Sequence, residues 1–212
     1  MKKRLIAIGD SITKGTYTAP GENSPQSIAH PNYAELVAEA FGYDELINYA
    51  HNGVCTSPFA GPFKSEATLL TFDRAEVGDA LILAGGTNDY SCSIPIGDFT
   101  DRTENTFLGA ARLLFEKISA AYPKDKVYVI NTAQRLKDGP NEVGSTLVEY
   151  RAAFSRIISE FGFLEIDCSK IDIDPKNPEH REKYVLDGLH PNVEGHKLYG
   201  EYIISRIKES IN

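Results

Sequence analysis

Residues 4–11 read Arg-Leu-Ile-Ala-Ile-Gly-Asp-Ser, a short apolar run followed by a glycine and two polar residues. A run that is apolar on both faces is typical of a buried strand in a parallel sheet. Gly9 permits a sharp turn, so that Ser11 lies just beyond the end of the strand. Ligand sites of open α/β sheets lie at that edge. The stretch therefore predicts an α/β fold and a candidate functional side chain.

Apolar runs of this kind recur along the chain and alternate with segments of helical spacing. The expected strands cover residues 4–8, 45–49, 80–84, 126–130 and 163–166. Repeated strand-then-helix order predicts a parallel sheet with right-handed crossovers. We expect a three-layer αβα sandwich with a five-stranded, flavodoxin-like sheet in the order 2-1-3-4-5.

The intervening helices are indicated by apolar side chains at helical spacing. One helix is expected over residues 104–122 with Thr103 as its cap, and others follow stripes that start at Tyr33, Leu147 and Tyr199. Gly42 and Gly162 end the stripes from Tyr33 and Leu147. We interpret these aromatic stripes as core packing. Three long loops are expected over residues 16–31, 57–74 and 91–102, two of which directly follow candidate site residues.

Composition limits the classes of function. The chain has 212 residues, of which 42% are hydrophobic and 25% charged, so we expect one domain over residues 1–212. A formal charge of -8 without a basic cluster argues against nucleic acid or an anionic membrane as a partner. The basic start is followed by an apolar stretch too short for a signal peptide, and we expect a cytoplasmic protein without a membrane span. The oligomeric state stays open.

Metal and thiol chemistry have weak support in the sequence. Cys55, Cys92 and Cys168 are widely spaced, which predicts free thiols and no zinc site. The acidic residues Asp167, Asp172 and Asp174 lack the glycine and glutamate of a calcium loop, so we interpret them as a solvated turn. We expect no metal and no cofactor.

A second polar motif, Asp187-Gly188-Leu189-His190, stands near the end of the chain. Pro191 and Asn192 are typical of a helix entrance, which would fix His190 at the sheet edge. A serine hydroxyl needs an imidazole to take its proton and an acid to orient that imidazole. Each motif is also a common turn sequence, but together they predict a triad of Ser11, His190 and Asp187.

The middle of the chain supplies candidate donors to an oxyanion. Asn88 follows the expected third strand within Gly85-Gly86-Thr87-Asn88-Asp89, and Gly53 lies shortly after the second strand. Acyl transfer develops negative charge on the carbonyl oxygen, and preorganised donors stabilise it. The Asn88 amide and the backbone N–H groups of Gly53 and Ser11 could form such an oxyanion hole.

Four blocks follow one another along the chain: Gly9-Asp10-Ser11, Gly53, Gly86-Thr87-Asn88-Asp89 and Asp187-Gly188-Leu189-His190. In this order they resemble the four blocks of the SGNH (GDSL) hydrolase family, and the resemblance spans the whole chain. The resemblance implies a flavodoxin-like sandwich and an acylhydrolase that needs no cofactor. It further implies Ser11 as nucleophile and oxyanion donor, Gly53 and Asn88 as further donors, His190 as general base and Asp187 as its orienting acid. The chain departs from the pattern at Ala50, where relatives often carry another glycine.

Several alternatives accompany this interpretation. An α/β-hydrolase is disfavoured because Thr13 stands where its nucleophile elbow needs glycine. A flavodoxin-like nucleotide or flavin module would need a phosphate cradle that is missing after the first strand. A non-catalytic carbohydrate-binding relative is a further alternative. The substrate could be an acetylated carbohydrate, a lysophospholipid, a thioester or a small ester, and we favour short acyl groups. We assign His51 and Cys55 structural roles and leave Arg135 out of the site.

Overall fold

A parallel five-stranded sheet forms the centre of the computed structural model, which describes residues 2–21, 23–58 and 66–211. Its strands are β1 (Arg4–Ile8), β4 (Glu45–Asn48), β5 (Ala80–Ala84), β6 (Val127–Asn131) and β7 (Leu164–Asp167). They lie in the order β4-β1-β5-β6-β7, all neighbours being parallel. Numbered along the chain within this sheet, that order is 2-1-3-4-5, as the sequence predicts.

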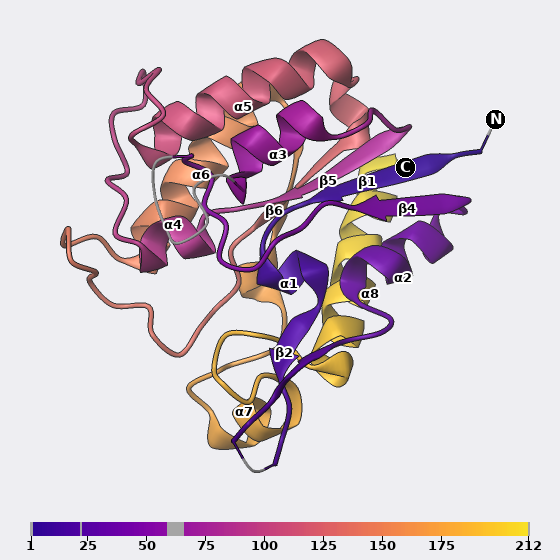
Figure 1. The fold of residues 1–212 in the computed structure, drawn as a ribbon, viewed down its shortest axis with the longest axis vertical. Coiled ribbons are helices and arrows are strands. Elements are labelled where there is room, and N and C mark those ends of the chain that lie inside the picture. The colour runs from indigo at the N-terminus through magenta and orange to yellow at the C-terminus, as the bar shows by residue number, and fades with distance from the viewer. Residues whose placement is uncertain (1, 22, 59–65, 212) are drawn as a thin grey trace.

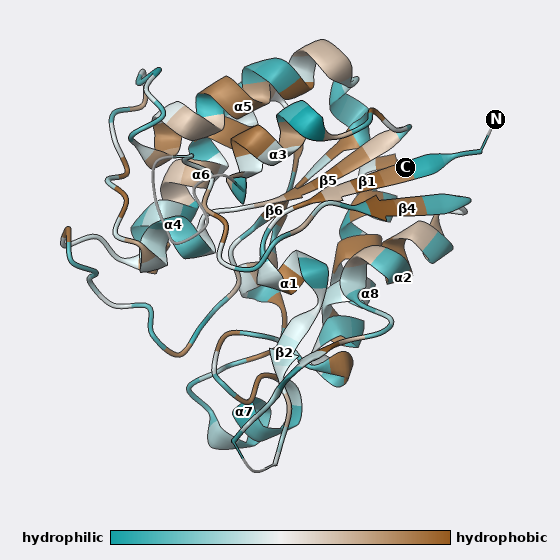
Figure 2. Cartoon of the chain, in the orientation of Figure 1, coloured by the Kyte–Doolittle hydropathy of each residue, from teal (hydrophilic) through white to brown (hydrophobic). Residues whose placement is uncertain are grey.

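Helices cover both faces of the sheet, which makes three layers (Figure 1). One face packs against α3 (Thr68–Arg74), α5 (Phe107–Ala121) and α6 (Leu147–Phe161), and the other against α2 (Tyr33–Ala40) and α8 (Val193–Ile211). Successive strand residues alternate between the faces, so Ile6 belongs to the first core and Leu5 to the second. Because both faces are covered, the central strands are apolar along most of their length (Figure 2).

One predicted helix boundary is wrong. The helix expected from residue 104 begins at Phe107, and Thr106 caps it by accepting a hydrogen bond from the Gly109 N–H at 3.2 Å. Thr103 instead closes a turn, since its hydroxyl accepts the N–H of Asn105 at 3.3 Å. The segment before Thr106 therefore makes local turn bonds that compete with a helix.

The expected loops contain regular structure that periodicity did not indicate. Residues 16–31 include an antiparallel hairpin of β2 (Thr16–Thr18) and β3 (Gln26–Ile28). The loop expected over 57–74 ends in α3, while its residues 59–65 lie outside the described residues. Short helices α1 (Ser11–Lys14), α4 (Thr87–Ser91) and α7 (Pro178–Tyr184) were likewise not predicted. One or two helical turns are too few to produce a periodic apolar pattern.

A buried histidine lies where α8 packs on α2. The His196 ring stacks on Tyr33, with 6.0 Å between ring centroids, and its Nδ1 accepts the Tyr33 N–H at 3.3 Å. The His196 Nε2 has no hydrogen-bond partner among the described residues. Burial disfavours the charged ring and lowers the pKa of His196 to about 3.

We expect His196 to make the fold sensitive to acid. Below its ordinary pKa of 6.5 the unfolded chain binds a proton that the folded chain refuses until about pH 3, so the free energy of unfolding falls over that interval. Each unit between the two pKa values corresponds to about 1.4 kcal/mol. Denaturant titrations at a series of pH values measure this slope.

The variant His196→Phe keeps an aromatic ring and removes the titration, so its free energy of unfolding should depend less on pH between 6.5 and 3. The variant must be compared with the parent, because Asp89 changes the free energy of unfolding in the opposite direction. Burial raises the pKa of Asp89 to about 6, which adds stability as the pH falls. Equal pH slopes in the parent and the variant would contradict the assignment to His196.

Candidate active site

The turn after β1 presents Ser11 at the carboxyl end of the sheet. A side chain at Gly9 would lie 2.3 Å from the Thr13 hydroxyl oxygen, so this position requires glycine. Asp10 caps α1, because its carboxylate accepts the Ile12 N–H at 2.9 Å. Burial raises the pKa of Asp10 despite that bond. Ser11 is thereby the first residue of a short capped helix.

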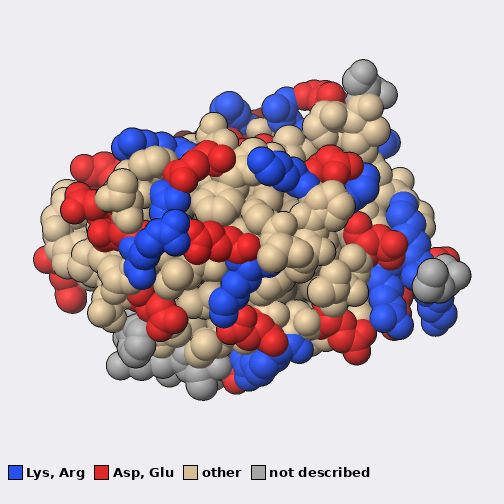
Figure 3. All heavy atoms as spheres, turned by 90° about the horizontal axis from the view of Figure 1, so that it is seen from above, with Lys and Arg blue, Asp and Glu red and all other residues tan. Residues whose placement is uncertain are grey.

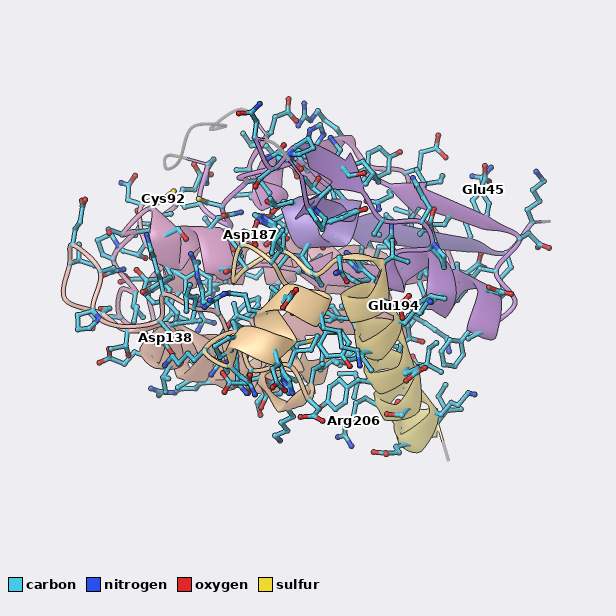
Figure 4. The ribbon with its side chains drawn as sticks, turned by 90° about the horizontal axis from the view of Figure 1, so that it is seen from below. Glu45, Cys92, Asp138, Asp187, Glu194 and Arg206 are labelled. Carbon is cyan, nitrogen blue, oxygen red and sulfur yellow. The ribbon has the colours of Figure 1, made fainter. Side chains whose placement is uncertain are left out.

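The loop before α8 brings the second motif to the same edge. Asn192 accepts the Gly195 N–H at 3.0 Å, which agrees with the predicted helix entrance. Gly188 has a φ of +77°, and its carbonyl accepts the Leu136 N–H at 2.8 Å. The loop is therefore fixed to the segment that follows β6. Figure 4 shows Asp187 far from Glu45, the first residue of β4, which lies at the amino ends of the strands.

Ser11, His190 and Asp187 form one hydrogen-bonded chain, although Ser11 and His190 are 179 positions apart. The Ser11 Oγ lies 2.8 Å from His190 Nε2, and His190 Nδ1 lies 2.8 Å from Asp187 Oδ2. With its proton on Nδ1, His190 donates to Asp187 and leaves Nε2 free to accept from Ser11. The structure thus brings the three predicted residues together, with His190 between Ser11 and Asp187 as predicted.

Asp187 is held by further donors. Its Oδ1 accepts the N–H groups of Leu189 and His190 at 2.9 and 2.8 Å, and its Oδ2 also accepts the Thr18 hydroxyl at 2.7 Å. Burial opposes ionisation, but the hydrogen bonds from His190 and Thr18 prevail and hold the pKa of Asp187 well below its usual range. The carboxylate therefore stays ionised around neutral pH.

Besides Ser11, the two other predicted oxyanion donors, Asn88 and Gly53, lie on neighbouring segments. Asn88 belongs to α4, directly after β5, and its side-chain amide donates to the Val54 carbonyl at 2.9 Å. Gly53 precedes Val54 and has a φ of +74°, which favours glycine. The Asn88–Val54 bond joins the loop of Gly53 to the start of α4.

Asp89 strengthens the same junction from inside the protein. Its buried carboxylate accepts the N–H groups of Thr56, Ser57 and Gly86 at 2.9 to 3.3 Å. Thr56 also donates its hydroxyl at 3.2 Å. Asp89 is therefore the internal connection between α4 and the loop that follows Gly53. Sequence reasoning quoted this residue within its motif but gave it no role.

Three further residues named in the sequence analysis, His51, Cys55 and Arg135, contact neighbouring protein groups. His51 Nε2 lies 3.5 Å from a Glu66 carboxylate oxygen, and Cys55 is buried with a free thiol. Arg135 donates to the hydroxyls of Ser91 at 2.7 Å and Thr87 at 3.3 Å, so it supports α4.

Within residues 2–21, 23–58 and 66–211, no three or more His, Cys, Asp or Glu side chains group in a way that could hold a metal ion. No helix in the same residues combines the length and apolar character that a membrane span requires.

Comparison with known proteins identifies the family. The model of the GDSL-like lipase/acylhydrolase family matches residues 7–198, which include both ends of the site. The chain belongs to this family. The resemblance inferred from the four motifs is therefore confirmed, and the chain is an acylhydrolase-family protein with the corresponding α/β fold. No curated protein matches the sequence significantly.

Several solved structures share the fold of this chain. A protein from Lactobacillus plantarum is 22% identical with a TM-score of 0.81, over 98% of this chain and 97% of that one. A lipase/acylhydrolase from Enterococcus faecalis is 22% identical with a TM-score of 0.63, over 98% and 96%. An acetyl-xylooligosaccharide esterase from Geobacillus is 15% identical with a TM-score of 0.62, over 97% and 94%.

Proposed function

We propose that the chain is a serine esterase that cleaves carboxylic esters through an acyl-enzyme intermediate. The observation that carries this proposal is the continuous hydrogen-bonded chain from Ser11 through His190 to Asp187. In that arrangement His190 can accept the Ser11 proton while Asp187 stabilises the resulting imidazolium. An ionised Asp187 is required for this role, and its low pKa supports it.

The reaction then proceeds in two halves. The Ser11 Oγ attacks the ester carbonyl carbon, His190 takes the proton, and collapse of the tetrahedral intermediate releases the alcohol with that proton. Water next attacks the acyl-enzyme, again giving its proton to His190, and the acid leaves as Ser11 regains its hydrogen. We assign the developing oxyanion to the backbone N–H groups of Ser11 and Gly53 and to the Asn88 amide.

Within this class we propose short acyl groups, such as acetyl, on carbohydrates or small alcohols. A net charge of -8 gives no attraction to an anionic lipid surface. On the face in Figure 3, basic and acidic side chains are interspersed rather than gathered into a basic patch. Both features favour small substrates over lysophospholipids. The Geobacillus fold relative acts on acetylated xylooligosaccharides, which justifies testing acetylated sugars first.

Covalent labelling tests the proposed chemistry without knowledge of the substrate. A fluorophosphonate reacts quickly only with a serine that a neighbouring base activates. We expect peptide mass mapping to locate the label at Ser11. A panel of acetylated xylose oligomers, lysophospholipids, acyl-CoA and p-nitrophenyl acetate, butyrate and octanoate should show fastest hydrolysis of the acetyl esters.

The two measurements separate the two levels of the proposal. An unlabelled Ser11, together with no hydrolysis of any ester, would overturn the serine esterase assignment and favour a non-catalytic binding protein. Labelling at Ser11 with a preference for lysophospholipids or acyl-CoA would retain the mechanism and overturn the assignment of short acyl groups.

A further inference from the structure

Strand β2 carries two threonines that each contact a different loop of the candidate site. The Thr18 hydroxyl donates to Asp187 Oδ2 at 2.7 Å, and the Thr16 hydroxyl donates to the Asn52 side-chain oxygen at 2.9 Å. Side chains two positions apart in a strand lie on the same face. One face of β2 therefore touches both the loop of the acid and the loop that contains Gly53.

The strand is fixed directly to the helix of the nucleophile. Gly15 ends α1 with a φ of +89°, and β2 begins at the next residue (Figure 1). The hairpin closes at its base, because the Ala29 N–H donates to the Gly15 carbonyl at 2.8 Å. A side chain at Gly15 would lie 3.0 Å from the Ala29 carbonyl oxygen, so the closure depends on glycine there. Displacements of α1 and β2 are thus coupled.

Thr18 belongs to a different structural element from the other hydrogen-bond donors to Asp187. Within the described residues, Leu189 and His190 supply the remaining donors, and both belong to the same loop as the acid. Thr18 is the donor that ties this loop to a separate element. Its hydroxyl shares Oδ2 with His190 Nδ1, so it restrains the very oxygen that orients the imidazole.

We propose that Thr18 and Thr16 are positioning residues for the esterase reaction, with Thr18 fixing the Asp187 carboxylate and Thr16 fixing the loop of Gly53. This inference rests on the proposed function. Neither hydroxyl reacts with the substrate. The hairpin adds a connection between the acid loop, the loop of Gly53 and the helix of Ser11, beyond the bonds that fix each loop to other segments.

The pair Thr18→Val and Thr18→Ser isolates the hydroxyl. Valine keeps the β-branched shape without the donor, whereas serine keeps the donor without the methyl group. For Thr18→Val we expect kcat on p-nitrophenyl acetate to fall about tenfold, as for loss of one hydrogen bond to a charged group. Thr18→Ser should stay within about twofold of the parent, because its hydroxyl can make the same bond.

A pH profile distinguishes positioning of the acid from a general structural effect. Without the Thr18 donor, Asp187 Oδ2 keeps more negative charge for His190, so the acidic limb of kcat/KM should move to higher pH. Among the described residues, Asp10, Arg135 and His196 also interact with Asp187 or His190, and Thr18→Val leaves all three in place. Thr16→Val should lower kcat without moving this limb.

The outcomes separate this inference from the proposed function. If the parent hydrolyses p-nitrophenyl acetate but Thr18→Val matches it in kcat and pH profile, the positioning role is wrong and the esterase stands. If the parent itself lacks activity and fluorophosphonate labelling, the proposed function fails first. Thermal denaturation of each variant must show the parental transition. A Thr18→Ser variant as impaired as Thr18→Val would also overturn the role of the hydroxyl.

Discussion

Replacing Ser11 by alanine should lower kcat for p-nitrophenyl acetate by about 10⁴-fold or more, with little change in the free energy of unfolding. The attacking oxygen is lost, whereas the backbone N–H groups that would bind the oxyanion remain. Asp10 still caps α1, and Thr13 still bonds to Tyr33 at 2.7 Å, so the helix should persist. Steady-state kinetics with circular dichroism measure both quantities.

Ser205→Ala provides a matched control for this variant. Ser205 lies on α8, exposed to solvent, and its hydroxyl bonds within its own helix to the Tyr202 carbonyl at 2.7 Å. That variant should retain the parental kcat and the fluorophosphonate label. Parental hydrolysis by Ser11→Ala would instead show that another group performs the attack, and the esterase mechanism would have to be abandoned.

The sheet could be predicted because its order follows from features that are local in sequence. The three central strands, β1, β5 and β6, are short runs of residues buried on both faces, and the crossover rule then leaves few arrangements. The hairpin of β2 and β3 could not be found this way. Its strands have three residues each, which is too few for an alternation of polar and apolar residues to be recognised. Its position depends on contacts between residues far apart in the sequence, such as those of Thr16 with Asn52 and of Thr18 with Asp187.

The same distinction separates the site residues that were predicted from those that were missed. Asp187 and His190 are three positions apart, so their contact can be predicted from the sequence. The chemistry of acyl transfer then identified Ser11 as their partner. Thr18 contacts Asp187 from 169 positions away, and a threonine in a polar loop carries no signal of that contact. Asp89 had a weak signal, since it stands three residues after Gly86, where an acidic residue can accept the free N–H groups at a helix start.

Replacing Asp187 by asparagine should lower kcat by about 10⁴-fold while leaving KM for small esters nearly unchanged. The amide can still accept the N–H groups of Leu189 and His190 through its oxygen, so the loop should keep its shape. Its NH₂ group would then face His190 Nδ1, which must accept rather than donate. That tautomer places the imidazole proton on Nε2, where it can no longer take the proton of Ser11.

A change of charge alone does not explain such a loss, and Asp172→Asn tests this point. Asp172 is exposed, and its replacement removes the same negative charge from the protein, so kcat should stay at the parental value. Fluorophosphonate labelling of Ser11 should slow strongly in Asp187→Asn and remain fast in Asp172→Asn. If Asp187→Asn lost less than about tenfold in kcat, the carboxylate would contribute no more than one ordinary hydrogen bond. The orienting role of Asp187, and with it the positioning role of Thr18, would then be wrong.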